Sequence, residues 1–146
     1  MIAFILLYLS LQTNTLSGKA VKIIDGDTFD ILSNGSLYRV RLNGIDCPER
    51  GQPYYREAKA ALGNFCNNRT ITVTYRSKDR NGRLLGDVYA GNQYINLLLV
   101  QQGYAWHFKK YSTDVRLAKA ETEARATKRG LWAVGNAIAP WVWRKR

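Results

Sequence analysis

A rapid succession of strand-like segments near the start of the chain constrains the fold most. Residues 19–25, 28–32 and 37–42 are rich in β-branched and apolar side chains, as strands usually are. An Asp-Gly-Asp sequence at 25–27 and an Asn-Gly pair at 34–35 separate them, and both are typical of tight hairpin turns. Because hairpins join antiparallel neighbours, the three segments predict an antiparallel meander.

Two more strands are predicted further along the chain. Residues 69–75 alternate regularly, with Ile71, Val73 and Tyr75 on one face and three threonines on the other. This pattern indicates a half-buried strand. Residues 84–89 form another strand-like segment, which follows a loop with an Asn-Gly pair at 81–82.

Three helices are expected between and after these strands. Residues 53–67 carry apolar side chains at helical spacing. A short helix over 97–102 is expected to be capped by Asn96, and a last helix covers 114–129. The whole pattern favours a mainly β α+β protein, a five-stranded antiparallel barrel of the OB type with three helices.

The charge of the chain limits the class of its partner. At 146 residues the chain is long enough for one domain with one core. Lys and Arg outnumber Asp and Glu by 22 to 11, so the formal net charge is +11. This excess favours a polyanionic partner, either a nucleic acid or an anionic membrane surface. A basic protein without such a partner is the alternative.

The first 17 residues differ from the rest because residues 2–11 are almost wholly apolar. This run is short for crossing a bilayer and matches the core of a signal peptide. No Lys or Arg precedes it, so a retained N-terminal anchor with transient membrane contact is the alternative. We expect 1–17 to be signal peptide or anchor and 18–146 to be the folded domain. The protein is then exported, either secreted or held in the periplasm or cell envelope.

The chain has two cysteines, Cys47 and Cys66. They could pair in an oxidising compartment, but their spacing does not require a disulfide.

The polar residues that could carry chemistry lie at predicted strand ends. Asp27 follows the first turn, while Arg41, Asp46 and Glu49 surround the turn after the third strand. Arg83 begins a later strand. A barrel brings such ends together. Carboxylates suit a hard cation such as calcium or magnesium, guanidinium groups fork onto phosphate, and a further carboxylate can position or activate water.

The order of the motifs resembles that of the thermonuclease, or staphylococcal-nuclease-like, family over residues 18–143. The motifs are Ile24-Asp25-Gly26-Asp27-Thr28, Arg41-x4-Asp46-Cys47-Pro48-Glu49, Asp79-Arg80-Asn81-Gly82-Arg83, Leu99-Val100-Gln101-Gln102-Gly103, Ala118-Lys119-Ala120-Glu121 and Gly130-Leu131-Trp132. The resemblance implies an OB-fold barrel and a Ca²⁺-dependent endonuclease. Such an enzyme hydrolyses phosphodiester bonds in DNA and RNA with low sequence specificity and leaves 3′-phosphate ends.

The resemblance also implies a role for each site residue. The calcium ligands would be Asp27, Asp46 and the main-chain carbonyl of Cys47. Glu49 would act on the attacking water, and the catalytic phosphate-binding residues would be Arg41 and Arg83.

Substrate contacts beyond the phosphate are expected from Arg80 and Tyr111. Asn81 and Lys109 stand where the best-known member of the family has tyrosines against the nucleotide ring. The expected partners are therefore DNA and RNA, bound by a monomer, and no protein partner is inferred.

A non-catalytic OB-type nucleic-acid-binding module is the main alternative, since it needs only a basic groove and aromatic side chains. Such a module has no need for three carboxylates that repel phosphate. An anionic-lipid-binding envelope protein leaves the same carboxylates unexplained.

Several residues outside these motifs have a structural interpretation. His107 is expected in an aromatic cluster rather than in catalysis. The residues expected to pack the C-terminal tail onto the body are Trp132, Trp141 and Trp143. The basic end, residues 144–146, is expected to be solvated.

Overall fold

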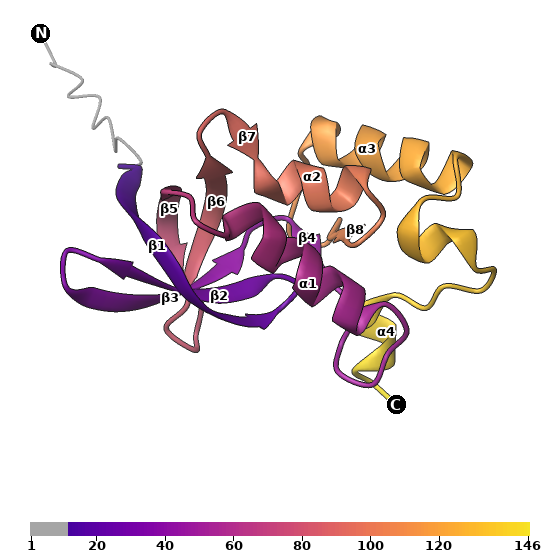
Figure 1. Ribbon diagram of the computed structural model, residues 1–146. Helices are drawn as coiled ribbons and strands as arrows, with labels where there is room; N and C mark the ends of the chain where they lie inside the picture. Colours follow the sequence, from indigo (N-terminus) through magenta and orange to yellow (C-terminus); the bar gives the residue numbers. More distant parts are fainter. Residues whose placement is uncertain (1–11) are drawn as a thin grey trace, which may run out of the picture.

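Five strands form a closed barrel in the computed structural model, which describes residues 12–146 (Figure 1). These strands are β1 (Asn14–Asp25), β2 (Thr28–Ser33), β3 (Ser36–Leu42), β5 (Ile71–Lys78) and β6 (Leu84–Ala90). Short strand β7 (Gln93–Tyr94) extends the sheet beside β6, and β4 (Ile45–Asp46) pairs separately with β8 (Trp106–His107). The predicted barrel is confirmed.

The polarity of the barrel corrects the sequence prediction in one respect. Neighbouring strands pair antiparallel except where β3 meets β6, and that pair is parallel. The sequence pattern revealed hairpins between consecutive strands, but the closing pair joins strands that are separated in the chain by β4, α1 and β5. The barrel is therefore mixed.

The strand register places several functional segments at one end of the barrel. Thr28 on β2 lies opposite Arg41 on β3, and Arg41 lies opposite Leu85 on β6. The first turn, the end of β3 and the start of β6 are therefore neighbours. The described strand β1 begins at Asn14, and residues 14–18 pair with β5. The last residues of the predicted leader thus belong to the barrel, while the apolar run 2–11 lies outside the described residues.

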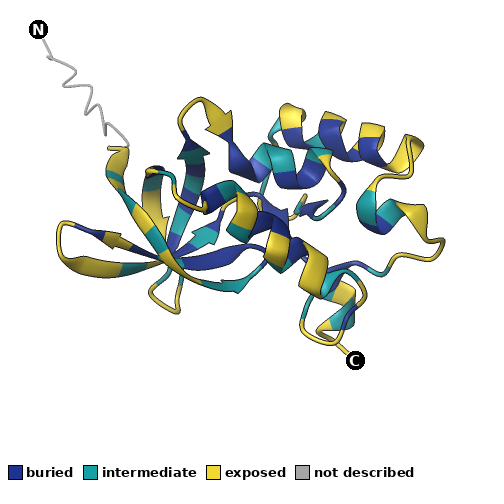
Figure 2. Ribbon diagram, in the orientation of Figure 1, coloured by how far each residue is buried: buried dark blue, intermediate teal, exposed yellow. Residues whose placement is uncertain are grey.

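Alternate residues of the strands fill the barrel, as their period of two requires. The fully buried side chains include Phe29, Ile31, Val40, Leu42, Ile71, Val73 and Val88. Helix α1 (Tyr55–Cys66) buries Ala58, Ala61, Leu62 and Cys66, which lie on the predicted apolar face. Figure 2 shows the buried parts of the strands and helices meeting in the interior. Both cysteines are buried free thiols.

Helix α2 (Ile95–Gln101) corrects the prediction for Asn96, which lies inside the helix and does not cap it. Its buried side chain accepts a hydrogen bond from the Val88 amide at 3.0 Å and donates to the Asn43 carbonyl at 2.9 Å. Tertiary partners therefore override the capping preference. The contact ties α2 to the turn that precedes Asp46.

Helix α3 (Val115–Ala126) starts as predicted, because the Asp114 carboxylate accepts a hydrogen bond from the Arg116 amide at 2.9 Å. A 3₁₀ turn η1 (Gly130–Ala133) and a short helix α4 (Pro140–Trp143) follow it. The described residues thus contain four α-helices rather than the three predicted. No helix within residues 12–146 has the length and apolarity needed to cross a membrane.

Aromatic side chains pack the C-terminal segment onto the body, as predicted. The Trp106 ring lies 4.5 Å from Trp132 and 5.4 Å from Trp141, between ring centroids. Phe108 stacks on Trp141 at 5.2 Å. These contacts bring α4 back to the end of the barrel where β4 lies.

Candidate active site

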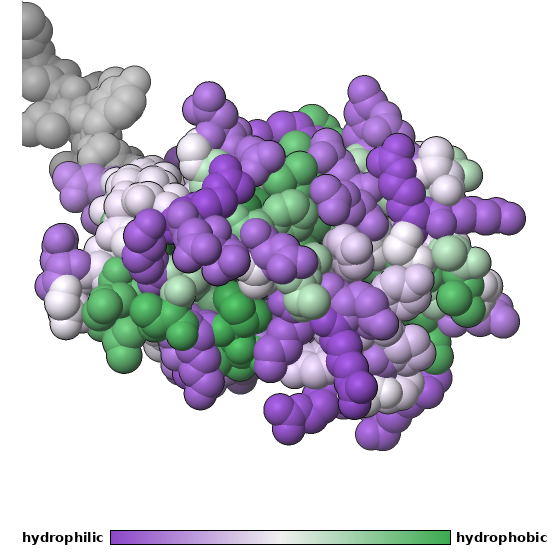
Figure 3. All heavy atoms as spheres, in the orientation of Figure 1, coloured by the Kyte–Doolittle hydropathy of each residue, from purple (hydrophilic) through white to green (hydrophobic). Residues whose placement is uncertain are grey.

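Seven of the eight predicted site residues line one cleft of about 710 Å³. They are Asp27, Arg41, Asp46, Glu49, Arg80, Arg83 and Tyr111. The eighth, Cys47, is buried, and its main chain contacts Asp27. Hydrophilic side chains are spread over the whole face of the molecule seen in Figure 3, with hydrophobic patches between them.

Arg41 is held between two carboxylates. Its Nε lies 3.4 Å from Oδ1 of Asp27, and its Nη2 lies 3.3 Å from Oδ1 of Asp46. Its Nη1 donates to the carbonyls of Leu42 and Ile45. The side chain is only 12% exposed, so this guanidinium has a fixed position in the cleft wall.

Asp27 is positioned by the main chain directly after β4 and by the Thr28 hydroxyl. Its Oδ2 accepts a hydrogen bond from the Cys47 amide at 2.7 Å, and its Oδ1 accepts from the Thr28 hydroxyl at 3.2 Å. The turn before it packs closely. A Cβ on Gly26 would lie 2.9 Å from the Cβ of Cys47 and 2.8 Å from that of Ala58. A glycine is therefore required where the turn approaches β4 and α1.

The carboxyl groups of this cluster repel one another. Burial, with the charge of Asp27, raises the pKa of Asp25 to about 7. Burial and the charge of Asp27 also raise the pKa of Asp46, against the opposing effect of a hydrogen bond from Arg144. The pKa of Arg41 is raised, because its carboxylate neighbours outweigh its burial. A site with this surplus of buried negative charge favours a bound cation.

Asp25 is a site residue that sequence reasoning did not select. It lines the same cleft, and its Oδ1 accepts a hydrogen bond from the Asp27 amide at 3.1 Å. The signal is the first carboxylate of the Asp-Gly-Asp turn, of which only the second, Asp27, is selected from the sequence.

The donor set fits a hard divalent cation that keeps water or substrate among its ligands. Asp27 and Asp46 would supply carboxylate oxygens to such a cation, and the main chain of Cys47 lies beside Asp27. Among residues 12–146, no three His, Cys, Asp or Glu side chains converge as a complete metal-binding group. Burial raises the pKa of the Cys47 thiol well above 9.0. The thiol is therefore neutral and unsuited to binding metal as a thiolate.

Arg83 reaches the cleft from the β5–β6 hairpin. Its Nε donates to Asp79 Oδ2 at 2.7 Å, and its amide donates to Asp79 Oδ1 at 3.0 Å. The Asp79 amide in turn donates to the Arg83 carbonyl at 2.8 Å, which closes the loop. One edge of this guanidinium is thus anchored. Tyr111, at the other side of the cleft, is largely exposed and touches Phe108 edge-on at 4.8 Å.

Arg144 corrects the expectation that residues 144–146 form a solvated end. Its Nη1 and Nη2 donate to Oδ1 and Oδ2 of Asp46 at 3.1 and 2.8 Å, and Nη1 also donates to Glu49 at 2.6 Å. The hydrogen bonds that Arg144 donates to Asp46, the largest influence, raise the pKa of Arg144. No local sequence signal marks this residue, because the packing of α4 brings it to the site.

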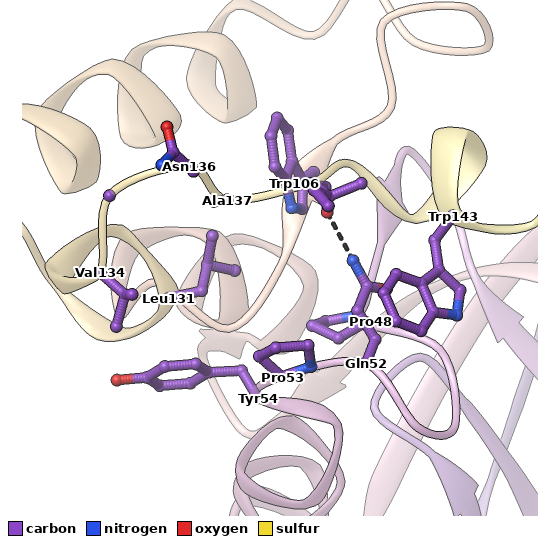
Figure 4. A pocket seen from close by; sticks show the side chains of 12 residues that line it. Pro48, Gln52, Pro53, Tyr54, Trp106, Leu131, Val134, Asn136, Ala137 and Trp143 are labelled. Atoms are coloured by element: carbon purple, nitrogen blue, oxygen red, sulfur yellow. Dashed lines mark hydrogen bonds between the residues drawn. The ribbon is translucent and has the colours of Figure 1, made fainter. Parts of the chain in front are cut away.

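Gln52 joins the loop that carries Glu49 to the C-terminal segment. Its Oε1 accepts a hydrogen bond from the Glu49 amide at 2.9 Å, and its Nε2 donates to the Ile138 carbonyl. Figure 4 shows this bond beside an apolar cavity of about 200 Å³ between the loop and that segment. Gln52 was not selected from the sequence.

Comparisons with known proteins place the chain among nucleases. Residues 39–134 match the model of the family described as "Staphylococcal nuclease homologue". A protein of Escherichia coli O157:H7 named "Uncharacterized endonuclease" is 39% identical over 132 residues, which cover 90% of this chain and 86% of that protein.

Two further relatives carry nuclease names. The "Micrococcal nuclease" of Shigella flexneri is 42% identical over 139 residues, covering 88% of this chain and 80% of the relative. A "Staphylococcal-like nuclease" of Arabidopsis thaliana is 40% identical over 131 residues, covering 90% of this chain and 40% of the relative. The chain therefore belongs to the staphylococcal nuclease family.

Proposed function

We propose that the protein is a calcium-dependent endonuclease that hydrolyses phosphodiester bonds in DNA and RNA with low sequence specificity and leaves 3′-phosphate ends. Its family makes it a nuclease, and the metal, the substrates and the product are the proposal. One observation carries it: the two predicted catalytic arginines, Arg41 and Arg83, face the same cleft as the three predicted carboxylates, Asp27, Asp46 and Glu49.

Two fixed guanidinium groups suit the charge that develops during phosphodiester hydrolysis. Attack on phosphorus places negative charge on the equatorial oxygens, and Arg41 and Arg83 would each donate to those oxygens. Arg41 is already held by Asp27 and Asp46, and Arg83 by Asp79. Groups that are positioned in advance cost little reorganisation during the reaction.

Glu49 is suited to act on the attacking water. Its side chain is 37% exposed in the cleft, and Gln52 holds its main chain. The carboxylate would orient a water molecule and accept its proton as the new oxygen–phosphorus bond forms. The bond from phosphorus to the 5′ oxygen breaks, and the phosphate stays on the 3′ end.

Asp27, Asp46 and the Cys47 carbonyl would hold the calcium ion. When bound, the ion supplies Lewis-acid stabilisation of the charge on the phosphate oxygens. Because the recognised groups belong to the nucleic-acid backbone, little sequence preference is expected.

The test is degradation of plasmid DNA and of RNA with calcium, magnesium or a chelator. We expect cleavage with calcium, no cleavage with chelator, and a loss of about 10²–10³ in rate for Glu49→Gln. Cleaved ends should accept a new phosphate from polynucleotide kinase without phosphatase treatment, because products with 3′-phosphates carry free 5′-hydroxyls. Activity that survives chelation or the Glu49 substitution would contradict the proposal. Tight binding without cleavage would favour the non-catalytic binding module.

We also propose that the protein is exported through residues 1–17. The support is the apolar run 2–11 followed by small polar residues. The mass of the protein recovered from the medium or periplasm shows whether residues 1–17 have been removed during export. An unprocessed chain found only inside the cell would contradict it.

A further inference from the structure

We propose that Arg144 competes with the divalent cation for the Asp46 carboxylate and thereby sets the metal affinity of the site. The inference rests on the proposed function, since it takes Asp46 as a metal ligand. It adds a determinant of metal affinity that lies in the C-terminal segment.

Arg144 occupies both oxygens of Asp46. The two guanidinium nitrogens bind Oδ1 and Oδ2 in a fork, at 3.1 and 2.8 Å. Asp46 is 1% exposed although it belongs to the wall of the cleft. A cation that approaches this carboxylate from the cleft therefore meets a guanidinium already in place.

Arg41 does not compete in the same way. It reaches only Oδ1 of Asp46, at 3.3 Å, and two main-chain carbonyls hold its Nη1. It can stay in position while Asp46 offers its other oxygen to a cation. Arg144 uses both oxygens, and its positive charge beside them repels a divalent ion.

The Arg144 side chain is free to leave while its backbone stays in place. It is 40% exposed, so its guanidinium can regain solvent. Trp141 holds α4 through its stack on Phe108, and Gln52 holds the segment before α4 through the Ile138 carbonyl. Metal binding therefore requires the loss of the ion pairs of Arg144 with Asp46 and Glu49 rather than undocking of the C-terminal segment.

Calcium titration of the full-length protein by calorimetry tests the inference without any activity measurement. We compare the wild type with Arg144→Gln, which removes the charge, and with Lys145→Gln, which removes the same charge one residue away. Lys145 is exposed and forms no part of the cleft that contains Asp46. We expect Arg144→Gln to tighten calcium binding on the order of tenfold and Lys145→Gln to leave it unchanged.

Thermal unfolding supplies a second readout. A ligand that binds only the folded state raises its melting temperature in proportion to the binding free energy. Saturating calcium should therefore raise the melting temperature of Arg144→Gln more than that of the wild type. Arg144→Lys, which keeps the charge but loses the fork, should fall between the two and replaces the glutamine variant if that variant does not fold.

Equal or weaker calcium binding by the Arg144 variants, with normal binding by the wild type, overturns the inference. Asp46→Asn separates this failure from failure of the proposed function. If the wild type binds calcium and Asp46→Asn does not, Asp46 is a calcium ligand, and this part of the proposed function holds even if the Arg144 variants show no tighter binding. If the wild type binds no calcium, the proposed function and this inference both fail.

Discussion

Arg83 and Lys145 carry the same charge but differ in what holds them. Arg83 lies in the cleft and is anchored by Asp79, whereas Lys145 is an exposed residue near the C-terminus. Arg83→Ala should therefore lower kcat/KM for DNA by about 10²–10³, because it removes a positioned donor to the developing charge. Lys145→Ala should change it little. Steady-state rates on a defined substrate measure both, and equal losses would argue against a positioned arginine.

Asp27 should determine how much calcium the enzyme needs. Asp27→Asn keeps the side-chain size but removes a negative charge from the proposed ligand set, so the calcium concentration for half-maximal activity should rise. Asp30→Asn is the matched control, since Asp30 pairs with Arg39 and lies outside the cleft. A calcium dependence unchanged by Asp27→Asn would remove this residue from the ligands.

The site residues found from the sequence are those that sit in motifs at strand ends. Asp27, Arg41 and Arg83 belong to this group, and the register of the barrel brings them together. Gln52 and Arg144 were missed because their roles arise from contacts between the loop after β4 and the C-terminal segment. Such contacts leave no periodic or local pattern in a single sequence.

At the scale of elements, α3 offers a direct test of a cap. Asp114→Ala should lower the free energy of unfolding by about 1 kcal/mol at pH 7, because the Arg116 amide loses its acceptor. The hydrogen bond from Arg116, the largest influence, lowers the pKa of Asp114 below 3.8. The charged carboxylate thus stabilises the folded state above that pH, and this contribution is lost as the pH falls through the lowered pKa.

Urea denaturation of the wild type and of Asp114→Ala, at pH 7 and below pH 3.8, measures the difference between their free energies of unfolding. Thr113→Ala serves as the control, since Thr113 is an exposed neighbour in the same loop. A gap between wild type and Asp114→Ala that stays constant at low pH would show that the charge of Asp114 plays no part.

Local pattern accounted for the longer elements and failed for those that depend on distant partners. The five barrel strands and the helices α1 and α3 follow from alternation, helical spacing and turn residues. Asn96 has a good capping side chain, but partners on Val88 and Asn43 place it inside α2. The two-residue strands β4, β7 and β8 are too short to show the alternation of apolar and polar residues that identifies a strand in a sequence.

At the scale of the whole molecule, the net charge of +11 predicts a strong effect of salt on substrate binding. With about three phosphate contacts, raising salt from about 50 to 200 mM should weaken binding on the order of tenfold. KM should rise while kcat changes little, because the bound complex makes the same contacts. Steady-state kinetics on single-stranded DNA across this range of salt concentration measure how steeply KM depends on salt. A KM independent of salt would contradict electrostatic recognition of the backbone.

The parallel pair of β3 and β6 also has a consequence for folding. It joins strands with β4, α1 and β5 between them, so it is a non-local contact with a large entropic cost of loop closure. The same pair sets Arg41 opposite Leu85, two residues beyond Arg83. The two arginines therefore come within reach of one phosphate only after the barrel has closed. A chain with its hairpins and helices formed but its barrel still open should be catalytically silent, and the appearance of activity during refolding should then report the closure of the barrel.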